Sequence, residues 1–314
     1  MIWHFGGIEG YFRSISLRVV EWAGFGWART LIAIYVPINI VYFGIGLRQR
    51  RSGKWWTLYG IHFAIVISMG LLSGSRSILL NVCLIQLLSY HYIRTQVKAQ
   101  YALFLAGTLV VASMTLAVAR NIVKLEGGSF TTGSSNTQSA SSVSSSVASF
   151  SYGIAPLEII ANTEYPVLAN GSTFFSLFTN AIPRDIWPNK PESGGVFFTK
   201  NYVGDIWRGY SNLTPTFLGE WIINFGWDIG IVGFFLSFGF FLLRLNASYK
   251  KLVQRLETDK SDVGAIDVII YIAITLGIFG LLVGETTNVL LSLVTTQLIP
   301  LWGIRWFIAL RSAR

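Results

Sequence analysis

Residues 265–283 read AIDVIIYIAITLGIFGLLV, a stretch in which Asp267 is the only charged residue. Its length and apolar character match the roughly 20 residues that an α-helix needs to cross the hydrocarbon core of a bilayer. Six further stretches share this character, at residues 30–47, 55–73, 77–93, 101–119, 229–248 and 287–304. Each can satisfy its backbone hydrogen bonds as a helix, as the membrane interior requires. The sequence therefore predicts an all-α fold, a polytopic membrane bundle of about seven transmembrane helices.

The composition agrees with this class. Hydrophobic residues make up 52% of the chain and charged residues 12%, whereas soluble domains are about a quarter charged. The formal charge of +9 would suggest nucleic-acid binding in a soluble protein. Here most basic residues lie just beyond the ends of apolar stretches, so the positive-inside rule explains them better and no nucleic-acid partner is expected.

The basic residues also predict the orientation. If the first stretch ends in the cytoplasm, the cations that fall inside are Arg48, Arg50, Arg51, Lys54, Arg94, Lys98, Lys250, Lys251, Arg255, Lys260, Arg311 and Arg314. This orientation places three regions outside, at residues 73–77, 126–227 and 285–288. We expect these three regions to form the site.

The chain divides into four parts by composition. Residues 1–29 mix charged and apolar residues and predict an amphipathic interfacial leader or a poorly ordered one, with no cleaved signal peptide. Residues 30–125 hold the first four predicted transmembrane helices, and residues 228–314 hold the last three. Between them lies a large external loop, with a Ser- and Gly-rich linker or lid at 126–151 and a folded part at 152–227.

Three motifs carry candidate chemistry, and the first is SGSRS at residues 73–77. Arg76 is its only charge, and the flanking Gly and Ser place amide and hydroxyl donors near the start of the next helix, where an anion can bind. The alternative is that Arg76 anchors the helix at lipid headgroups.

The second motif is IPRDIWPNKP at residues 182–191, in which three prolines stiffen a basic turn. Arg184 can hold phosphate oxygens in a bidentate manner and Lys190 adds a compact charge, so the pair suits a diphosphate. Alternatively, Arg184 and Asp185 pair with loop neighbours. Trp187 suits stacking on a sugar or a place in an interfacial belt, and Arg208 is a further external cation with the same two interpretations as Arg184.

The third motif is Pro215 followed by GEWIINFG at residues 219–226. Glu220 and Asn224 lie one helical turn apart on one face. A carboxylate beside desolvating aromatics can accept a proton from a sugar hydroxyl. The alternative is that Glu220 forms an ion pair with an external arginine.

Other chemistry is disfavoured by what the sequence lacks. It contains no GxGxxG, no GxxxxGK[ST], no HExxH and no paired-aspartate metal motif, and Cys83 is its only cysteine. We therefore expect no nucleotide-driven step, no metal and no cofactor. His62 is expected to make helix contacts or to lie at the membrane interface rather than to bind a ligand.

Taken in order and spacing, the three motifs resemble those of the O-antigen polymerase (Wzy) family, the oligosaccharide repeat-unit polymerases. The resemblance covers roughly residues 55–314, and the 182–191 loop is its most specific part. Members of that family usually have ten or more helices, which agrees with an expectation that upstream helices are missing from this chain.

The resemblance implies a GT-C-like glycosyltransferase in a bacterial inner membrane, with the large loop in the periplasm. Its substrate would be an undecaprenyl-diphosphate-linked oligosaccharide, with a chain-length regulator and a flippase as candidate partners. The implied catalytic residues are Arg76, Arg184, Glu220 and, as an alternative base, Asp185; Lys190, Arg208, Trp187 and Asn224 would bind substrate. Two other functions stay open: an O-antigen ligase acting on lipid A core, and a glycolipid transporter without chemistry.

Overall fold

The computed structural model describes residues 3, 4, 6, 7, 10, 33–49, 51–72, 76–105, 107, 108, 111, 123–126, 129–132, 154–180, 182, 185–204, 213–258 and 261–312. These residues are helical apart from turns, loops and a short hairpin, in which β1 (Val123–Glu126) pairs antiparallel with β2 (Ser129–Thr132). The chain forms two compact units. The first comprises residues 1–149, 259–272 and 299–314, and the second comprises residues 150–258 and 273–298.

Within the described residues, three helical segments are long and apolar enough to cross a membrane: Thr216–Leu256, Asp262–Gly280 and Thr286–Arg311. The prediction of a helical fold with helices apolar and long enough to span a membrane is confirmed, and the count of seven spans and the GT-C-like fold stay predictions. Most of the predicted span 101–119, of the leader 1–29 and of the linker 126–151 lies outside the described residues.

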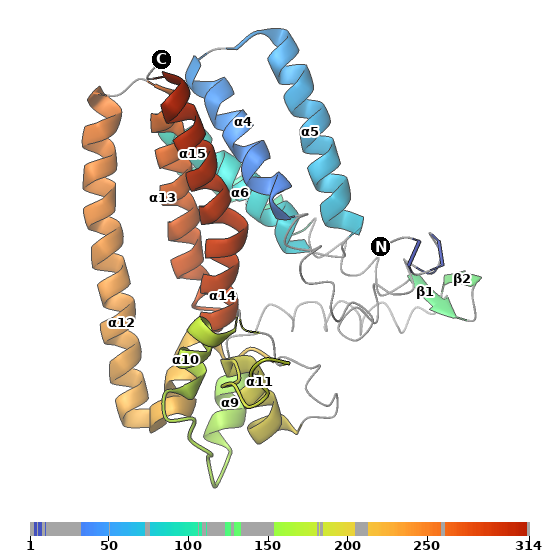
Figure 1. Cartoon of the computed structure of the whole chain (residues 1–314), viewed down its shortest axis with the longest axis vertical. Helices are drawn as coiled ribbons and strands as arrows, with labels where there is room; N and C mark the ends of the chain where they lie inside the picture. Colours follow the sequence, from blue (N-terminus) through green and yellow to red (C-terminus); the bar gives the residue numbers. More distant parts are fainter. Residues whose placement is uncertain are drawn as a thin grey trace. The chain divides into compact units, whose positions relative to one another are not determined.

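Three consecutive helices form the core of the first unit (Figure 1): α4 (Tyr35–Gln49), α5 (Gly53–Leu72) and α6 (Arg76–Ile93). A buried polar network joins them. Asn39 Nδ2 lies 3.0 Å from His62 Nδ1, and Gln86 Nε2 donates to Asn39 Oδ1 at 2.8 Å. Each helix thus supplies one polar side chain whose partner is on another helix, which satisfies buried polar atoms and fixes how the helices pack. His62 makes the helix contact that we predicted.

The charged residue within the stretch 265–283 also has a partner in the first unit. Asp267 lies on α13 (Asp262–Gly280), and its Oδ1 accepts from Arg305 Nε on α15 (Ile299–Ser312) at 2.6 Å. A carboxylate on an apolar helix is costly in a membrane unless it is paired. This ion pair therefore explains how Asp267 is accommodated in so apolar a stretch.

The second unit is built around α12 (Thr216–Thr258), which is broken at Gly226, where φ is 78° and ψ is 177°. A straight helix of 43 residues would be about 65 Å long, roughly twice the hydrocarbon thickness. Two contacts show that the chain folds back at this break. A Cβ on Gly230 would lie 2.8 Å from Ile222 Cα, and a Cβ on Gly233 would collide with the Trp221 ring. Residues 216–225 therefore pack against the start of the long second part of α12.

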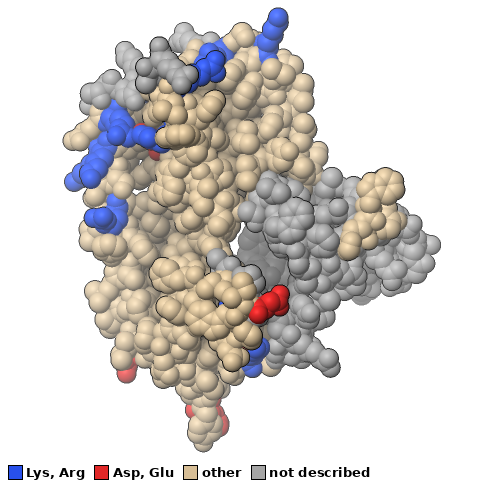
Figure 2. All heavy atoms as spheres, in the orientation of Figure 1, with Lys and Arg blue, Asp and Glu red and all other residues tan. Residues whose placement is uncertain are grey.

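The long part of α12 is basic towards its carboxyl end. Figure 2 shows Lys and Arg gathered over this part of the helix, which carries Arg244, Lys250, Lys251 and Arg255. Asp228 lies at the opposite end, just after the break. The asymmetry follows the pattern of membrane helices whose basic end faces the cytoplasm.

We predict that Gly230→Ala lowers the thermal unfolding temperature of the purified protein, because the added methyl group meets backbone atoms of Ile222 that have little freedom to move. The measurement is a melting curve in detergent. Gly239→Ala is the matched control, since Gly239 is on the same helix and has nothing within 4 Å of an added Cβ. Equal melting temperatures for the two variants would contradict the fold-back.

Candidate functional site

Two fully buried polar residues, Glu220 and Asn224, lie one turn apart on the first part of α12, as predicted. Asn224 Nδ2 donates to the Glu220 carbonyl at 2.7 Å and to Thr173 Oγ1 at 2.6 Å, while Asn224 Oδ1 accepts from Gly171 N at 2.8 Å. Every polar atom of the Asn224 amide group is therefore used within the protein. Its side chain fixes the position of Glu220 and of α10 (Ser172–Thr179).

The helix break at Gly226 also affects the backbone carbonyls of the residues just before it. In the last turn before a helix break, the backbone carbonyls lack the hydrogen bond from the N–H group four residues further along the chain. Ala169 N donates to the Ile223 carbonyl at 2.9 Å, and Asn170 N donates to the Asn224 carbonyl at 3.2 Å. The segment that leads into α10 thus satisfies the broken end of the helix, and this pairing holds the loop against α12.

The Glu220 carboxylate joins α12 to a turn far along the chain. Its Oε2 accepts from Thr286 N, the first residue of α14 (Thr286–Ser292), at 2.7 Å. Its Oε1 is buried and has no hydrogen-bond partner among the described residues. The hydroxyls of Thr173 and Thr286 lie close to the carboxyl group. One oxygen of Glu220 therefore anchors a helix start, and the other is left for a further interaction.

A second buried carboxylate, Glu285, lies in the same turn. It is fully buried and accepts a hydrogen bond from Gly195 N in α11 (Gly194–Phe198). A Cβ on the preceding Gly194 would lie 2.8 Å from both Cδ and Oε1 of Glu220. Consecutive glycines thus contact the two carboxylates, and a larger side chain at Gly194 would collide with Glu220.

Hydroxyl groups complete the polar cluster between α10 and α14. Ser176 Oγ lies 2.7 Å from Thr287 Oγ1 and donates to the Thr173 carbonyl at 2.6 Å. All three residues are buried. Together these residues form the acid cluster, which consists of Thr173, Ser176, Gly194, Gly195, Glu220, Asn224, Glu285, Thr286 and Thr287.

The loop of the IPRDIWPNKP motif is closed at its base by Lys190. Its Nζ donates to the Asn180 carbonyl at 3.1 Å and to the Ile182 carbonyl at 2.6 Å. Asp185 is exposed and Trp187 is 38% exposed. Lys190 thus acts as a tie across the loop that carries Arg184, in addition to any role in binding substrate.

The segment after this loop is held in place by η1 (Thr199–Val203), which continues α11. Thr199 Oγ1 donates to the Gly195 carbonyl at 2.8 Å and accepts from Leu213 N at 2.9 Å. Tyr202 Oη donates to the Val167 carbonyl at 2.9 Å, and burial raises the pKa of this phenol above its ordinary value. These contacts hold the covering segment over Glu220.

The structure therefore brings together some of the predicted residues. Glu220 and Asn224 lie beside the 285–288 turn, which we predicted to share their site. Arg184, Arg208 and the side chain of Arg76 lie outside the described residues, so their predicted convergence stays a prediction. Within the part of the chain that is described, Glu220 makes no ion pair, and its alternative role as the partner of an external arginine stays a prediction, because those arginines lie outside that part.

Sequence reasoning missed Glu285 as a chemical group, together with its contact to Gly195. The repeated dipeptide Gly-Glu, at 219–220 and at 284–285, is the signal that could have paired them. No group of three His, Cys, Asp or Glu within the described ranges is placed to hold a metal ion.

The chain matches no protein-family model, no curated protein and no solved structure.

Proposed function

We propose that the chain polymerises undecaprenyl-diphosphate-linked oligosaccharide repeat units into a surface polysaccharide, at the periplasmic face of a bacterial inner membrane. The observation that carries the proposal is the acid cluster. It packs a buried carboxylate, one oxygen of which has no hydrogen-bond partner among the described residues, beneath the segment that follows the basic IPRDIWPNKP loop. The motifs at 73–77, 182–191 and 219–226 supply the resemblance to the polymerase family.

The reaction transfers a glycan from its lipid diphosphate to a sugar hydroxyl. The acceptor hydroxyl oxygen forms a bond to the donor C1, while the bond between C1 and the diphosphate oxygen breaks. Glu220 takes the hydroxyl proton, and the departing diphosphate takes the electron pair of the broken bond. Arg184, Arg208 and Arg76 are proposed to stabilise that developing charge, in place of a metal ion.

Glu220 is fully buried in this conformation, beneath Gly194. A general base must come within hydrogen-bond reach of the proton that it takes. In this proposal the segment 191–204 therefore moves when the acceptor binds. Gly194, at the contact with Glu220, has no side chain to be withdrawn, so a backbone shift alone uncovers Oε1.

The test is a reaction with purified protein in detergent and a synthetic lipid-diphosphate repeat unit as sole substrate. We expect a ladder of products, each one repeat unit longer than the last, measured by mass spectrometry. The ladder should form without nucleotide sugar and persist in EDTA, because fixed cations replace a metal. Lipid A core is then added as a competing acceptor. Transfer to core in place of chain growth would identify a ligase instead.

A second candidate function is a transporter for anionic glycolipids, and one observation favours it. Transporters often bind substrate where a membrane helix is broken, and α12 is broken at Gly226 beside buried Glu220 and Asn224. Proteoliposomes separate the two functions. Movement of a labelled lipid-linked unit across the bilayer, with no new glycosidic bond, would support transport over polymerisation.

A further inference from the structure

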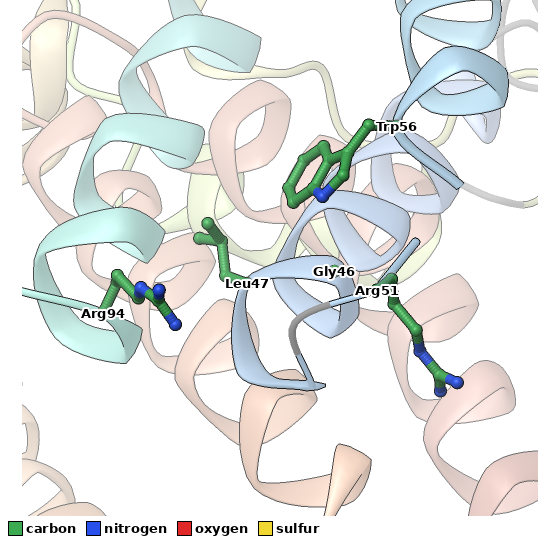
Figure 3. A pocket seen from close by; sticks show the side chains of 5 residues that line it. All are labelled: Gly46, Leu47, Arg51, Trp56 and Arg94. Atoms are coloured by element: carbon green, nitrogen blue, oxygen red, sulfur yellow. The ribbon is translucent and has the colours of Figure 1, made fainter. Parts of the chain in front are cut away.

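A small basic pocket lies in the first unit, where α4 ends, α5 begins and α6 ends (Figure 3). Its volume is about 250 Å³, and its lining residues are Gly46, Leu47, Arg51, Trp56 and Arg94. Sites for drug-sized ligands have volumes of roughly 300–1,000 Å³, so this pocket suits a smaller group. A Cβ on Gly46 would lie 3.1 Å from the Trp56 ring, so the absence of a side chain lets this indole form the wall.

Arg51 is held at the rim of the pocket by neighbouring groups. Its guanidinium carbon lies 5.0 Å from the Trp55 ring centroid, and its Nη2 lies 3.5 Å from Asp262 Oδ2. Trp55 is itself stacked on Tyr42, with centroids 4.1 Å apart. Both the stacking and the ion pair reduce the freedom of the arginine before any ligand arrives.

Arg94 is the cation that remains available. It follows the last residue of α6 and is exposed, and its side chain makes no hydrogen bond or ion pair with the described part of the chain. In Figure 3 its guanidinium group extends towards Leu47, whereas that of Arg51 turns away from the middle of the pocket. All of the N–H donors of the Arg94 guanidinium can therefore bind a ligand that enters the pocket.

The charge balance around the pocket is positive. Among the residues that the structure describes, Asp262 is the acid there, and it interacts with both Arg51 and Arg48. Arg94 is not offset by it, and Lys54 adds positive charge at the start of α5. An anion is therefore the favoured ligand, and a planar guanidinium beside an indole wall suits phosphate oxygens.

The depth of the pocket in a bilayer follows from Asp262. This residue begins α13, one of the candidate membrane spans, so its partner Arg51 lies at the level where a span meets the aqueous phase. Tryptophans such as Trp55 and Trp56 are enriched at that level. Basic pockets between helices at the cytoplasmic interface commonly bind anionic lipid headgroups.

We propose that this pocket binds the phosphate of an anionic phospholipid headgroup, gripped by Arg94 and bordered by Arg51 and Trp56. The site is separate from the acid cluster and does not depend on the proposed polymerase activity. The ligand chemistry is a phosphate ester with a net negative charge, which phosphatidylglycerol has and zwitterionic phosphatidylcholine lacks.

The test is native mass spectrometry of the full-length chain in mixed micelles doped with phosphatidylglycerol or phosphatidylcholine. We expect phosphatidylglycerol to stay bound preferentially, and Arg94→Gln to weaken its apparent affinity about five-fold, the loss of one interfacial cation contact. Lys98→Gln is the matched control, because it removes an exposed charge four residues further on that does not line the pocket. Arg94→Lys should lie between Arg94→Gln and wild type, since it keeps the charge but loses the planar fork.

Two outcomes would overturn the proposal. Equal losses in Arg94→Gln and Lys98→Gln would mean that lipid responds only to the general surface charge. Displacement of phosphatidylglycerol by inorganic phosphate, together with phosphate binding in its absence, would assign the pocket to a soluble anion. Because Arg94 is exposed at a helix end, its variants should have the same melting temperature as wild type in phosphatidylcholine. This measurement checks folding independently of lipid binding.

Discussion

Glu220→Gln is expected to lower the polymerisation rate by at least about 100-fold while the protein still folds, because a positioned general base contributes about 10²–10⁴ in rate. Glutamine has nearly the same shape as glutamate, and its amide oxygen can still accept the hydrogen bond from Thr286 N. The substitution therefore keeps the anchor of α14 and removes the base. The measurement is the rate of product-ladder growth with purified protein, beside its melting temperature.

Two further variants separate chemistry from structure at this position. Glu220→Leu leaves the Thr286 N–H without an acceptor, which costs about 1–3 kcal/mol for a buried donor, so it should lower the melting temperature as well as the rate. Glu285→Gln is the matched control, because Glu285 is equally buried and also accepts from a backbone N–H, that of Gly195. It should keep a near wild-type rate. If Glu220→Gln polymerises normally, then Glu220 is only an anchor and the proposed base is wrong.

The helices that sequence predicted best are those defined by a local property. The lengths of the apolar stretches predicted helices at residues 55–73, 77–93 and 265–283. In the structure these are α5 (Gly53–Leu72), α6 (Arg76–Ile93) and α13 (Asp262–Gly280). Each needs only a run of apolar residues bounded by charged residues or small polar ones. Whether such a helix spans the membrane also depends on its neighbours, which composition does not specify.

The first part of α12 shows where this reasoning stops. Sequence placed Glu220 and Asn224 on one helical face, because that follows from a spacing of four residues. It did not show that the helix folds back at Gly226 or that Glu220 meets Thr286, 66 residues further on. Sequence does not distinguish four glycines of this helix. Gly226 breaks it, Gly230 and Gly233 allow close packing, and Gly239 has nothing within 4 Å of an added Cβ. These differences arise from tertiary contacts.

The acid cluster also changes the balance between the candidate functions. Transporters often bind substrate at polar or broken membrane helices. The structure places Glu220, Asn224 and Glu285 fully buried beside a broken helix. The distinction between polymerase and transporter therefore depends on the cationic residues, since only chemistry requires them to stabilise a leaving group.

The second large effect is expected for Arg184→Ala, which should leave protein level and membrane insertion unchanged while abolishing polymer. Only single repeat units should then reach the cell surface, as measured by gel electrophoresis of the surface polysaccharide. A positioned donor aimed at developing negative charge contributes on the order of 10²–10³ in rate, and a diphosphate leaving group develops such charge. Arg184 is predicted to lie in an external loop, and substitutions at surface positions usually change the free energy of unfolding by about 0.5 kcal/mol or less.

The neighbours of Arg184 make this experiment specific. Asp185→Asn tests the alternative base at an exposed position and should leave chain length normal. Lys190→Gln removes the tie to the Asn180 and Ile182 carbonyls, so it should loosen the loop and shorten chains without abolishing them. Arg184→Lys keeps the charge but loses the bidentate fork, and should recover part of the activity. Normal chain lengths in Arg184→Ala would remove this arginine from the mechanism, and the transporter would become the better account of the broken helix.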